Sequence, residues 1–344
     1  MFTALIEKLG RREDLTVEEA AAAMTAIMRG EAAPAQMAGL LVGLSMKGER
    51  PAELVGFARA MRANAVALAA PAGDVFDTCG TGGDRAGTFN ISTAAAIVIA
   101  ACGVRVAKHG NRSVSSRCGS ADVLEALGVN IAAEPPVVER CLAEAGLAFF
   151  FAPTFHPAMR HAAPTRRALG VRTAFNLLGP LTNPAAPARQ IVGVPRPDLT
   201  ELLARALSQL GSQRAWVVHG ADGLDELSTT GYTKVSECHG GAVKTFYVHP
   251  ADYGLPKAPP DALKGGDAAA NAAIVADVLA GVEGPPRDVV LLNAGAALFV
   301  AGRAGSVPEG VALAADAIDS GRAREVLAVL TRVSAGGAAT GAPA

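Results

Sequence analysis

The sequence predicts an α/β protein, with a small N-terminal all-α domain followed by a larger α/β domain that is built on a central, mainly parallel sheet. Two observations carry this prediction. Residues 1–70 have the pattern of short, Ala-rich amphipathic helices, and over residues 71–333 short apolar stretches alternate with helical ones. The 344 residues are enough for two domains, and because the chain is 50% hydrophobic but only 4% aromatic, its core is expected to consist mainly of Ala, Val, Leu and Ile.

Within the first domain, helices are expected at about residues 16–30, 34–48 and 51–65. The first begins with a capping-box pattern from Thr16 to Glu19, and a glycine ends it. The other two begin at prolines, which suit the first turn of a helix. Helices of this kind pack as a small bundle or form a dimer surface.

The larger domain is predicted from alternating elements. Buried strands are expected at residues 75–77, 104–108, 147–151, 190–193 and 215–219. The intervening helices are expected at residues 92–102, 121–127, 136–145 and 198–210. Residues 156–169 have the pattern of a further helix, residues 175–184 that of a Gly/Pro/Asn loop, and residues 267–333 are again Ala-rich and helical. The tail, residues 334–344, is expected to be disordered.

Composition narrows the class of protein. The chain carries 31 basic and 32 acidic residues, which gives no support for a nucleic-acid-coating surface. Its 5 cysteines show no CxxC spacing, so they are expected to be reduced thiols in a cytoplasmic protein. Neither a basic-then-apolar leader nor a run of 18 apolar residues is present, so no membrane association is expected.

The first of two glycine-rich segments, residues 77–84, leads from an expected strand towards a helix start. Glycines such as Gly80 leave backbone amides open to an anion, and Asn90 and Ser92 can either cap the helix or meet that anion. Asp84 cannot bind phosphate directly and needs a hydroxyl, an amide or a metal as its partner. An ordinary strand-to-helix turn with a serine cap would show the same glycines.

The second segment, residues 108–116, weakens that plain interpretation, because packing gives no reason for a buried strand to end in Lys-His-Gly-Asn-Arg-Ser. Lys108 would supply a mobile point charge for phosphate, and the serines would donate hydrogen bonds. Ser120 is equally suited to cap the next helix, and a loop histidine such as His109 is more often a scaffold residue than a base. Two such loops together indicate a ligand with two phosphate groups at different ends.

Charged residues elsewhere give weaker signals. Asp225 and Glu226 follow the expected strand at residues 215–219 and can hold Mg²⁺ through oxygen ligands and waters. An isolated acidic pair is more often a solvated turn, although a diphosphate ligand would favour Mg²⁺. Arg167 and Arg172 each offer a fork that suits a carboxylate, and each is equally compatible with a basic surface at a helix end.

Taken together, these segments resemble the anthranilate phosphoribosyltransferases. The resemblance is carried by residues 77–84 with 90–93, 108–127, 156–159, 172–184 and 222–226. It runs in the same order through nearly the whole chain, and the Lys-His-Gly-Asn-Arg-Ser stretch is its most specific part. The resemblance implies a fold like that of the nucleoside phosphorylases and phosphoribosyltransferases. In that fold a helical segment near residues 156–185 completes the small domain, and a homodimer is joined mainly through the α domains.

The implied reaction transfers the 5-phosphoribosyl group from phosphoribosyl pyrophosphate to the amine of anthranilate, releasing pyrophosphate and serving tryptophan biosynthesis. Loss of pyrophosphate is the difficult event, so electrostatic help from Lys108 and Asp84 is expected, with no covalent nucleophile or general base. A pair of Mg²⁺ ions per monomer is expected at Ser92, Asp225 and Glu226. Anthranilate is expected at Gly80, Asn111 and Arg166. Phosphoribosyl pyrophosphate is expected at Gly80, Gly83, Asp84, Thr88, Asn90, Ile91, Ser92, Thr93, Lys108, His109, Gly110, Asn111, Arg112, Ser113, Val114, Ser115, Ser116 and Ser120.

The chain departs from the family pattern at several positions. Arg85 and Ala86 stand where glycine is frequent, Cys118 where serine is common, and Thr165 where valine is common. Two other functions remain as alternatives: an enzyme like pyrimidine nucleoside phosphorylase, and a nucleic-acid-binding relative without activity. The acidic pair and the complete first loop argue against the former, and the near-neutral charge of −1 argues against the latter.

Overall fold

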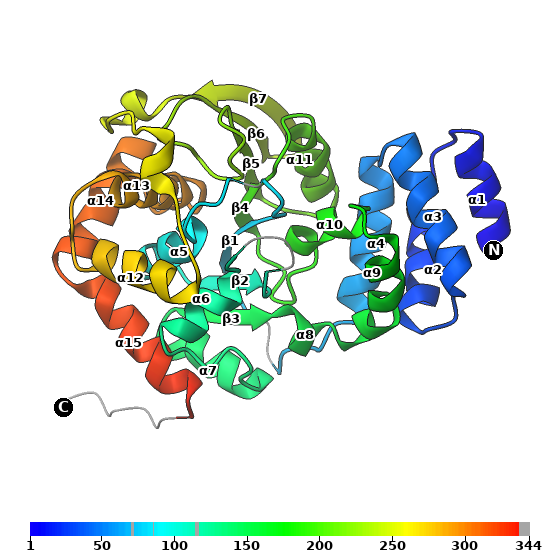
Figure 1. Ribbon diagram of the computed structural model, residues 1–344, viewed down its shortest axis with the longest axis horizontal. Coiled ribbons are helices and arrows are strands. Elements are labelled where there is room, and N and C mark those ends of the chain that lie inside the picture. The colour runs from blue at the N-terminus through cyan, green and yellow to red at the C-terminus, as the bar shows by residue number, and fades with distance from the viewer. Residues whose placement is uncertain (70–71, 85, 114–116, 337–344) are drawn as a thin grey trace.

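The protein is described by a computed structural model that covers residues 1–69, 72–84, 86–113 and 117–336 (Figure 1). Four residues of the glycine-rich segments and most of the tail lie outside the described residues: Arg85, Val114, Ser115, Ser116 and residues 337–344. Figure 1 shows a helical lobe at the N-terminal end of the chain and a larger lobe built around a sheet. No helix in the described part of the chain is both long and apolar enough to cross a bilayer.

The N-terminal lobe is helical, as predicted. Its helices are α1 (Phe2–Gly10), α2 (Val17–Met28), α3 (Pro34–Lys47) and α4 (Pro51–Ala63). The capping box is present at the start of α2: Thr16 Oγ1 accepts from the Glu19 amide at 3.2 Å, and Glu19 Oε2 accepts from the Thr16 amide at 2.8 Å. Prolines occupy the first turns of α3 and α4, where a missing N–H costs nothing.

The second lobe contains a 7-stranded sheet in the order β3-β2-β1-β4-β5-β6-β7. The strands are β1 (Phe76–Gly80), β2 (Val106–Gly110), β3 (Leu147–Phe151), β4 (Arg189–Gly193), β5 (Arg214–Gly220), β6 (Thr233–His239) and β7 (Ala242–Val248). The first five run parallel, and β6 and β7 pair antiparallel after β5. The mainly parallel sheet is therefore confirmed.

The antiparallel pair at the sheet edge was not predicted. A turn at Gly240 and Gly241, both with positive φ, joins β6 to β7. Two residues of positive φ match the twist of an antiparallel hairpin, which is why glycines stand there. The edge strand β7 is largely exposed, so its sequence lacks the apolar run that marks a central strand.

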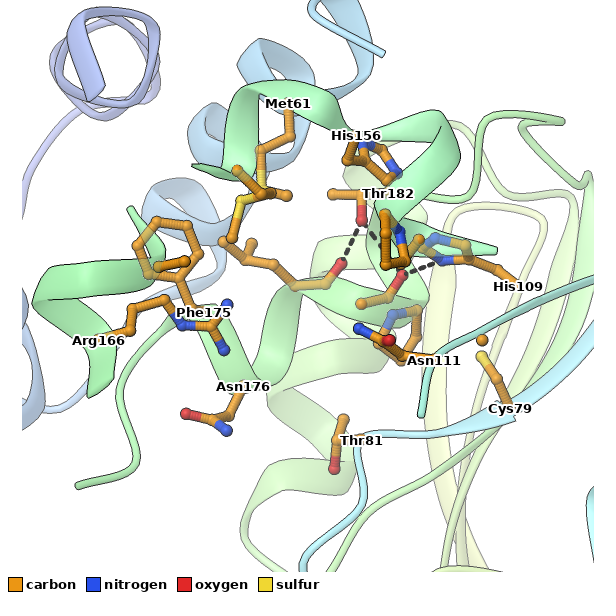
Figure 2. A pocket seen from close by; sticks show the side chains of 18 of the residues that line it. Met61, Cys79, Thr81, His109, Asn111, His156, Arg166, Phe175, Asn176 and Thr182 are labelled. Atoms are coloured by element: carbon orange, nitrogen blue, oxygen red, sulfur yellow. Dashed lines mark hydrogen bonds between the residues drawn. The ribbon is translucent and has the colours of Figure 1, made fainter. Parts of the chain in front are cut away.

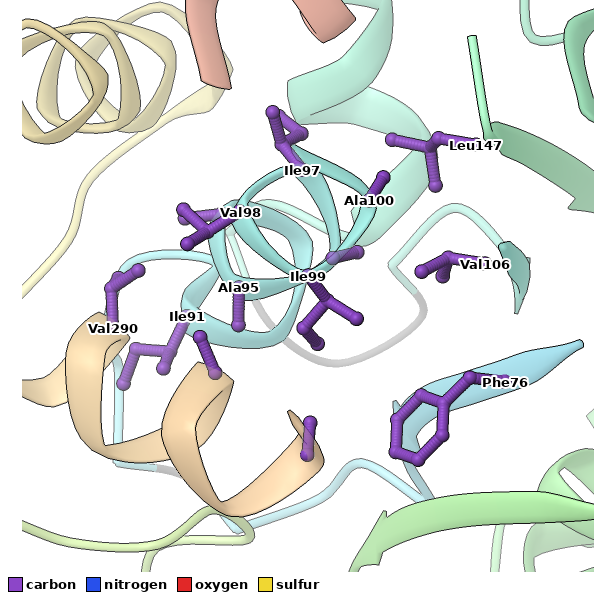
Figure 3. Close-up of a cluster of buried hydrophobic side chains, with 14 of the residues drawn as sticks. Phe76, Ile91, Ala95, Ile97, Val98, Ile99, Ala100, Val106, Leu147 and Val290 are labelled. Atoms are coloured by element: carbon purple, nitrogen blue, oxygen red, sulfur yellow. The ribbon is translucent and has the colours of Figure 1, made fainter. Parts of the chain in front are cut away.

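Helices cover both faces of the sheet. They are α5 (Ile91–Ala101), α6 (Ser120–Ala126), α7 (Pro135–Glu144), α11 (Leu199–Gln209), α12 (Ala268–Leu279), α13 (Pro285–Val300), α14 (Val307–Asp319) and α15 (Arg322–Ser334), with short 3₁₀ turns η3 (Pro250–Tyr253) and η4 (Pro260–Leu263). The helix α5 is apolar on all sides because it is enclosed. Figure 3 shows it between the strand side chains Phe76 and Val106 and the α13 side chain Val290.

The other face joins the two lobes. α11 lies against β5 and β6 on one side and against α4 of the helical lobe on the other. Buried side chains of the helical lobe therefore form one continuous apolar cluster with Val192 of β4 and Val217 of β5. This shared core fixes the position of the helical lobe relative to the sheet, and with it the position of the residues that lie between the two.

The segment between β3 and β4 differs from the prediction. The single helix expected at residues 156–169 is divided into η1 (Pro157–His161) and α9 (Ala163–Leu169), and a further short helix, α8 (Ala152–Phe155), precedes it. Pro157 has no N–H and disfavours helical dihedrals at His156, whose φ and ψ are −122° and 59°. The loop expected at residues 175–184 instead contains α10 (Phe175–Leu178) and η2 (Gly179–Leu181).

The C-terminal boundary also shifts. Ser334 was placed in the disordered tail, but it is the last residue of α15 and only 3% exposed. Its Oγ accepts a hydrogen bond from the Asn130 amide at 3.0 Å. This long-range contact, which the local composition does not reveal, extends the helix to that point.

Candidate active site

The topology brings the two glycine-rich loops together at the carboxyl ends of the central parallel strands, which form one edge of the sheet. β1 lies between β2 and β4, and the chain passes from β1 through α5 to β2 on one side. Loops that leave the carboxyl ends of such strands enclose a crevice, which is where α/β sheets bind ligands. The loops after β1, β2 and β5 carry the residues that the sequence singled out.

A cavity of about 530 Å³ opens between this edge and the helical segments. Its wall is formed by the ends of β1 and β2, by α4, and by the α8–α10 segment. Figure 2 shows Arg166 and Phe175 on one side of the cavity and Asn111, His109 and Cys79 on the other. Gly80, Asn111 and Arg166, the three residues that the sequence proposed for one ligand, all line it.

Two arginines line this cavity, the exposed Arg160 and the more buried Arg166. Arg166 lies on α9, and its Cζ atom is 4.9 Å from the centroid of the Phe175 ring. Burial lowers the pKa of the Arg166 guanidinium, and among the described residues no carboxylate forms an ion pair with it. A partly desolvated guanidinium without an anion is a place where a ligand carboxylate is stabilised. The neighbouring Arg167 is exposed and does not line the cavity.

Two buried histidines form the inner wall. The ring centroids of His109 and His156 are 5.2 Å apart, and His109 Nδ1 lies 3.1 Å from the Gly179 carbonyl oxygen. The Nε2 atom of each ring is buried and has no hydrogen-bond partner among the described residues. Burial lowers the pKa of His109 to about 3 and that of His156 to about 4, so both rings are neutral at pH 7.

The sequence missed several residues of this wall. Phe175, Met61 and Thr182 line the cavity, as does His156, which sequence reasoning placed only in a segment of resemblance. Their spacing along the chain carries no signal, because α4, α8 and α10 meet only in the folded molecule. The contact of Phe175 with Arg166 likewise joins residues that are separated in the sequence, so no local signal could have found it.

The first glycine-rich loop packs directly on the acidic turn. The Gly82 amide donates to Asp225 Oδ2 at 3.1 Å. A Cβ atom at Gly80 or at Gly193 would collide with Asp225, so both strand ends need glycine for the turn to approach. A Cβ at Gly83, whose φ is +87°, would collide with the Arg172 guanidinium, which places Arg172 beside the loop and not in the cavity wall.

The acidic pair is not a solvated turn: Glu226 is buried and Asp225 is partly buried. Glu226 is 8% exposed, and its Oε1 accepts from the Ser92 amide at 3.2 Å. Burial raises the pKa of Glu226 to about 7, and burial together with the Asp84 carboxylate raises the pKa of Asp225 well above its ordinary value. Crowded, desolvated carboxylates of this kind are stabilised by a divalent cation.

These residues fit a Mg²⁺ ion that is coordinated partly by the protein and partly by a bound phosphate compound. Over the described ranges, no group of three or more His, Cys, Asp or Glu side chains has the geometry of a complete metal site. The Asp225 and Glu226 carboxylates and the Ser92 hydroxyl would supply only part of a Mg²⁺ coordination shell, with phosphate oxygens and water at the other positions. Mg²⁺ is bound in this way in most phosphate-dependent enzymes.

Lys108 is not the mobile charge that the sequence indicated. It is 2% exposed, and its Nζ donates to the Thr78 carbonyl at 2.6 Å and to Ser92 Oγ at 3.3 Å. Burial lowers the pKa of the ammonium, which the Asp77 carboxylate opposes. Ser92 therefore links the Lys108 ammonium to the Glu226 carboxylate.

The second glycine-rich loop is held by acidic residues at the start of α6. Arg112 forms ion pairs with Asp122 at 2.9 Å and with Glu125 at 2.8 Å, so its charge is already compensated. The N-cap of α6 is Gly119, and Ser120 is the first helical residue, so Ser120 is not the cap. Its Oγ donates to the Asn111 carbonyl at 3.3 Å.

The remaining predicted residues fall into two groups. Ile91 and Thr93 are 1% exposed, and Ile91 packs in the apolar core, which leaves only its backbone for a ligand. Thr88 forms a β-bridge with Lys264, whereas Gly110 borders the cavity and Ser113 donates its amide to Asp122.

Asn90 is fixed on both sides. Its Oδ1 accepts from Asn271 Nδ2 at 3.0 Å and from Cys118 Sγ at 3.3 Å. The cysteine that departs from the family pattern thus takes the donor role that a serine hydroxyl would have.

Comparison with known proteins was consistent along the chain. A family model described as "Glycosyl transferase family, a/b domain" matches residues 72–324, and one described as "Glycosyl transferase family, helical bundle domain" matches residues 3–65. The anthranilate phosphoribosyltransferase of Moorella thermoacetica is 56% identical over 323 residues, covering 94% of this chain and 95% of that protein. That of Rubrobacter xylanophilus is 53% identical over 335 residues, covering 97% and 98%.

Solved structures agree with the sequence relatives. The crystal structure of anthranilate phosphoribosyltransferase from Thermus thermophilus has a TM-score of 0.90 at 48% identity and covers 96% of this chain and 99% of that one. The enzyme from Saccharomyces cerevisiae in complex with phosphoribosyl pyrophosphate and Mg has a TM-score of 0.88 at 27% identity, covering 97% and 98%. The chain therefore belongs to the anthranilate phosphoribosyltransferases, and with them to the glycosyl transferase family whose helical bundle and a/b domains it contains.

Proposed function

We propose that this protein transfers the 5-phosphoribosyl group from phosphoribosyl pyrophosphate to the amine of anthranilate, forming N-(5-phosphoribosyl)anthranilate and pyrophosphate. One observation carries the proposal: the cavity with the uncompensated Arg166 guanidinium opens onto both glycine-rich loops. A carboxylate-accepting pocket next to a phosphate-binding edge is what an acceptor acid and a diphosphate donor require together.

Anthranilate is proposed to bind with its carboxylate at Arg166. The guanidinium offers a planar fork, and Phe175 and Met61 supply apolar surface for the aromatic ring. Gly80 and Asn111 lie across the cavity, at the side of the loops, and are proposed to meet the amine end. The ligand would thereby point its amine towards the edge of the sheet where the ribose is expected.

Phosphoribosyl pyrophosphate is proposed to bind at the loops after β1 and β2. The Gly80–Asp84 stretch supplies glycine backbone at the end of β1, and α5 begins at Ile91, where the helix dipole favours an anion. The first amides of α5 already have partners, since the Ile91 amide donates to the Phe89 carbonyl and the Ser92 amide to Glu226 Oε1. Lys108 adds a buried positive charge next to the start of α5, where its Nζ donates a hydrogen bond to Ser92 Oγ. The ion pairs of Arg112 with Asp122 and Glu125 reduce the part that its charge can take in binding phosphate.

Mg²⁺ is proposed at Asp225, Glu226 and Ser92, with a pair of ions per monomer. The relative from Saccharomyces cerevisiae, solved with phosphoribosyl pyrophosphate and Mg, supports the use of this metal. When bound, Mg²⁺ neutralises charge on the diphosphate, which makes pyrophosphate a better leaving group.

The protein's own contribution is positioning and electrostatics. The neutral His109 and His156 rings add no positive charge to the acceptor pocket, and Arg166 is proposed to orient the carboxylate because it is more buried than the exposed Arg160. Lys108 stabilises negative charge that grows on the departing pyrophosphate. The amine of anthranilate needs no prior deprotonation, so no covalent nucleophile or general base takes part.

The protein is further proposed to act as a homodimer joined through its helical lobes, in the cytoplasm. On α3, Met46 is 76% exposed and Val42 is 37% exposed, one helical turn apart, and such an apolar stripe favours a helix partner. Light scattering on the native chain and on Met46→Asp tests the dimer, which the charged variant should dissociate.

One assay tests the reaction itself. Anthranilate fluorescence is followed in the presence of phosphoribosyl pyrophosphate, with Mg²⁺ and with a chelator. The proposal expects the signal to fall only when donor and metal are both present, and to remain constant when either is omitted. A constant signal under all conditions contradicts the proposed reaction.

A further inference from the structure

One polar side chain interrupts the buried, apolar part of helix α13 in the larger lobe. α13 (Pro285–Val300) carries no charged or amide side chain after Asp288 except Asn293. Asn293 is only 3% exposed, surrounded by Leu, Val and Ala of the same helix. Asparagine is a poor residue for a helix interior, and burying its amide is unfavourable unless every polar atom finds a partner. Its presence therefore points to specific contacts.

Asn293 contacts the main chain of two residues, Leu227 and Val289. Asn293 Oδ1 accepts from the Leu227 amide at 3.0 Å, and Asn293 Nδ2 donates to the Leu227 carbonyl at 2.9 Å. Nδ2 also donates to the Val289 carbonyl of its own helix at 2.8 Å. The Asn293 side chain thus hydrogen-bonds to both the amide and the carbonyl of Leu227, in the way that two paired strand residues do. Its bond to the Val289 carbonyl of α13 fixes the orientation of the Asn293 side-chain amide.

Leu227 directly follows Glu226, so this grip acts on the acidic pair. Leu227 is itself fully buried, which removes water as an alternative partner for its amide and carbonyl. On the other side of the pair, the Gly220 amide donates to the Leu224 carbonyl at 2.8 Å. The segment with Asp225 and Glu226 is therefore clamped on both sides, and Asn293 provides the clamp nearest to Glu226.

The same helix positions the opposite side of the site. α13 packs against α5, and Figure 3 shows Val290 beside Ile91 at the start of α5. The next residue, Ser92, donates its amide to Glu226 Oε1 at 3.2 Å. Through Val290 and Asn293, one rigid helix therefore sets the spacing between the Ser92 hydroxyl and the Glu226 carboxylate.

We propose that Asn293 is a positioning residue for the Mg²⁺-diphosphate site, holding Asp225 and Glu226 in register with Ser92 through the main chain of Leu227. The proposal rests on the proposed function, since it gives Asn293 a role towards the metal and phosphoribosyl pyrophosphate. Asn293 touches neither of them and acts only through the backbone it holds.

The test compares Asn293→Leu with Leu298→Ala. The first variant keeps the helix apolar but removes both hydrogen bonds to Leu227. The second removes a fully buried side chain of the same helix and leaves Leu227 untouched, so it reports general loss of packing. Asn293→Ser serves if Asn293→Leu does not fold, because a serine hydroxyl can bond to the carbonyl four residues earlier but is too short to grip Leu227.

Three quantities are measured on each protein: the Kd of the Mg²⁺–phosphoribosyl pyrophosphate complex by calorimetry, the KM for anthranilate, and hydrogen exchange of the Leu227 amide. In the Asn293 variants we expect faster exchange at Leu227 and a Kd raised by roughly tenfold, which is the effect of about one lost hydrogen bond. The KM for anthranilate should change less than twofold, because Arg166 lines the cavity and the residues of this turn do not.

An unchanged Kd in the Asn293 variants overturns the proposal, and so does an equal rise in Leu298→Ala, which would reveal a purely structural role. Failure of the wild-type protein to bind the Mg²⁺ complex would overturn the proposed function itself. The two failures are distinguishable because only the second appears in the unmodified chain.

Discussion

Replacing Arg166 by alanine is the sharpest test of the acceptor site. Arg166 is a partly buried guanidinium with a Phe175 ring on one side and no carboxylate partner in the described part of the chain. If it binds the carboxylate of anthranilate, the lost charged hydrogen bonds amount to about 1.5–3 kcal/mol, which corresponds to a roughly 10- to 150-fold higher KM for anthranilate. The lower half of this range is expected, because the half-exposed site is partly screened by solvent.

The assay is initial-rate fluorescence with either substrate varied at saturating levels of the other. Arg167→Ala is the matched control: it removes the same charge at the next position, but from an exposed side chain outside the cavity. Arg166→Lys should fall between the wild type and alanine, because lysine keeps the charge and loses the fork. A rise confined to the KM for phosphoribosyl pyrophosphate, or an equal effect in Arg167→Ala, would refute the placement of Arg166.

Three further predictions concern the donor site and the cavity wall. Changing both Asp225 and Glu226 to alanine should reduce Mg²⁺-dependent turnover by at least about 100-fold, as loss of a metal site removes several kcal/mol of charge stabilisation, with an unchanged circular dichroism spectrum; near-normal turnover would contradict the metal assignment. Lys108→Ala should weaken phosphoribosyl pyrophosphate more than anthranilate in calorimetry, and the reverse order would count against its role. The folded protein keeps the His109 and His156 rings neutral down to about pH 3 and 4, whereas the unfolded chain takes up these protons below about pH 6.5. Their contribution to the free energy of unfolding is thus complete above pH 6.5 and is lost on acidification, by up to roughly 1.4 kcal/mol per pH unit and ring. When both histidines are changed to glutamine, the free energy of denaturant unfolding should therefore depend less steeply on pH between pH 6.5 and 4. An unchanged slope would contradict this prediction.

Much of the fold can be predicted from local features of the sequence. The Thr16–Glu19 capping box, the prolines at the starts of α3 and α4, and the apolar stretches of the parallel strands each act through neighbouring residues. Such signals predict elements well. They fail where a distant contact decides the structure, as at Ser334, which is bound by Asn130 of another segment.

The candidate site shows the same division. The glycines and the Lys-His-Gly-Asn-Arg-Ser run indicated phosphate binding because their chemistry is unusual for a strand end. The interaction of Gly193 with Asp225, the burial of Lys108 and the ion pairs of Arg112 were not visible, because each joins segments that are far apart in sequence.

The sequence by itself determined the alternation of strands and helices, the two glycine-rich loops and the class of reaction that they resemble, because those depend on residue chemistry at short spacing. Only the tertiary structure decided that the Lys108 ammonium is buried, that two histidines close the inner wall of the cavity, and that Glu226 is buried against Ser92. The reason is physical: burial and partner choice set the charge of a side chain, and both arise only when the helical lobe and the sheet pack on a common core.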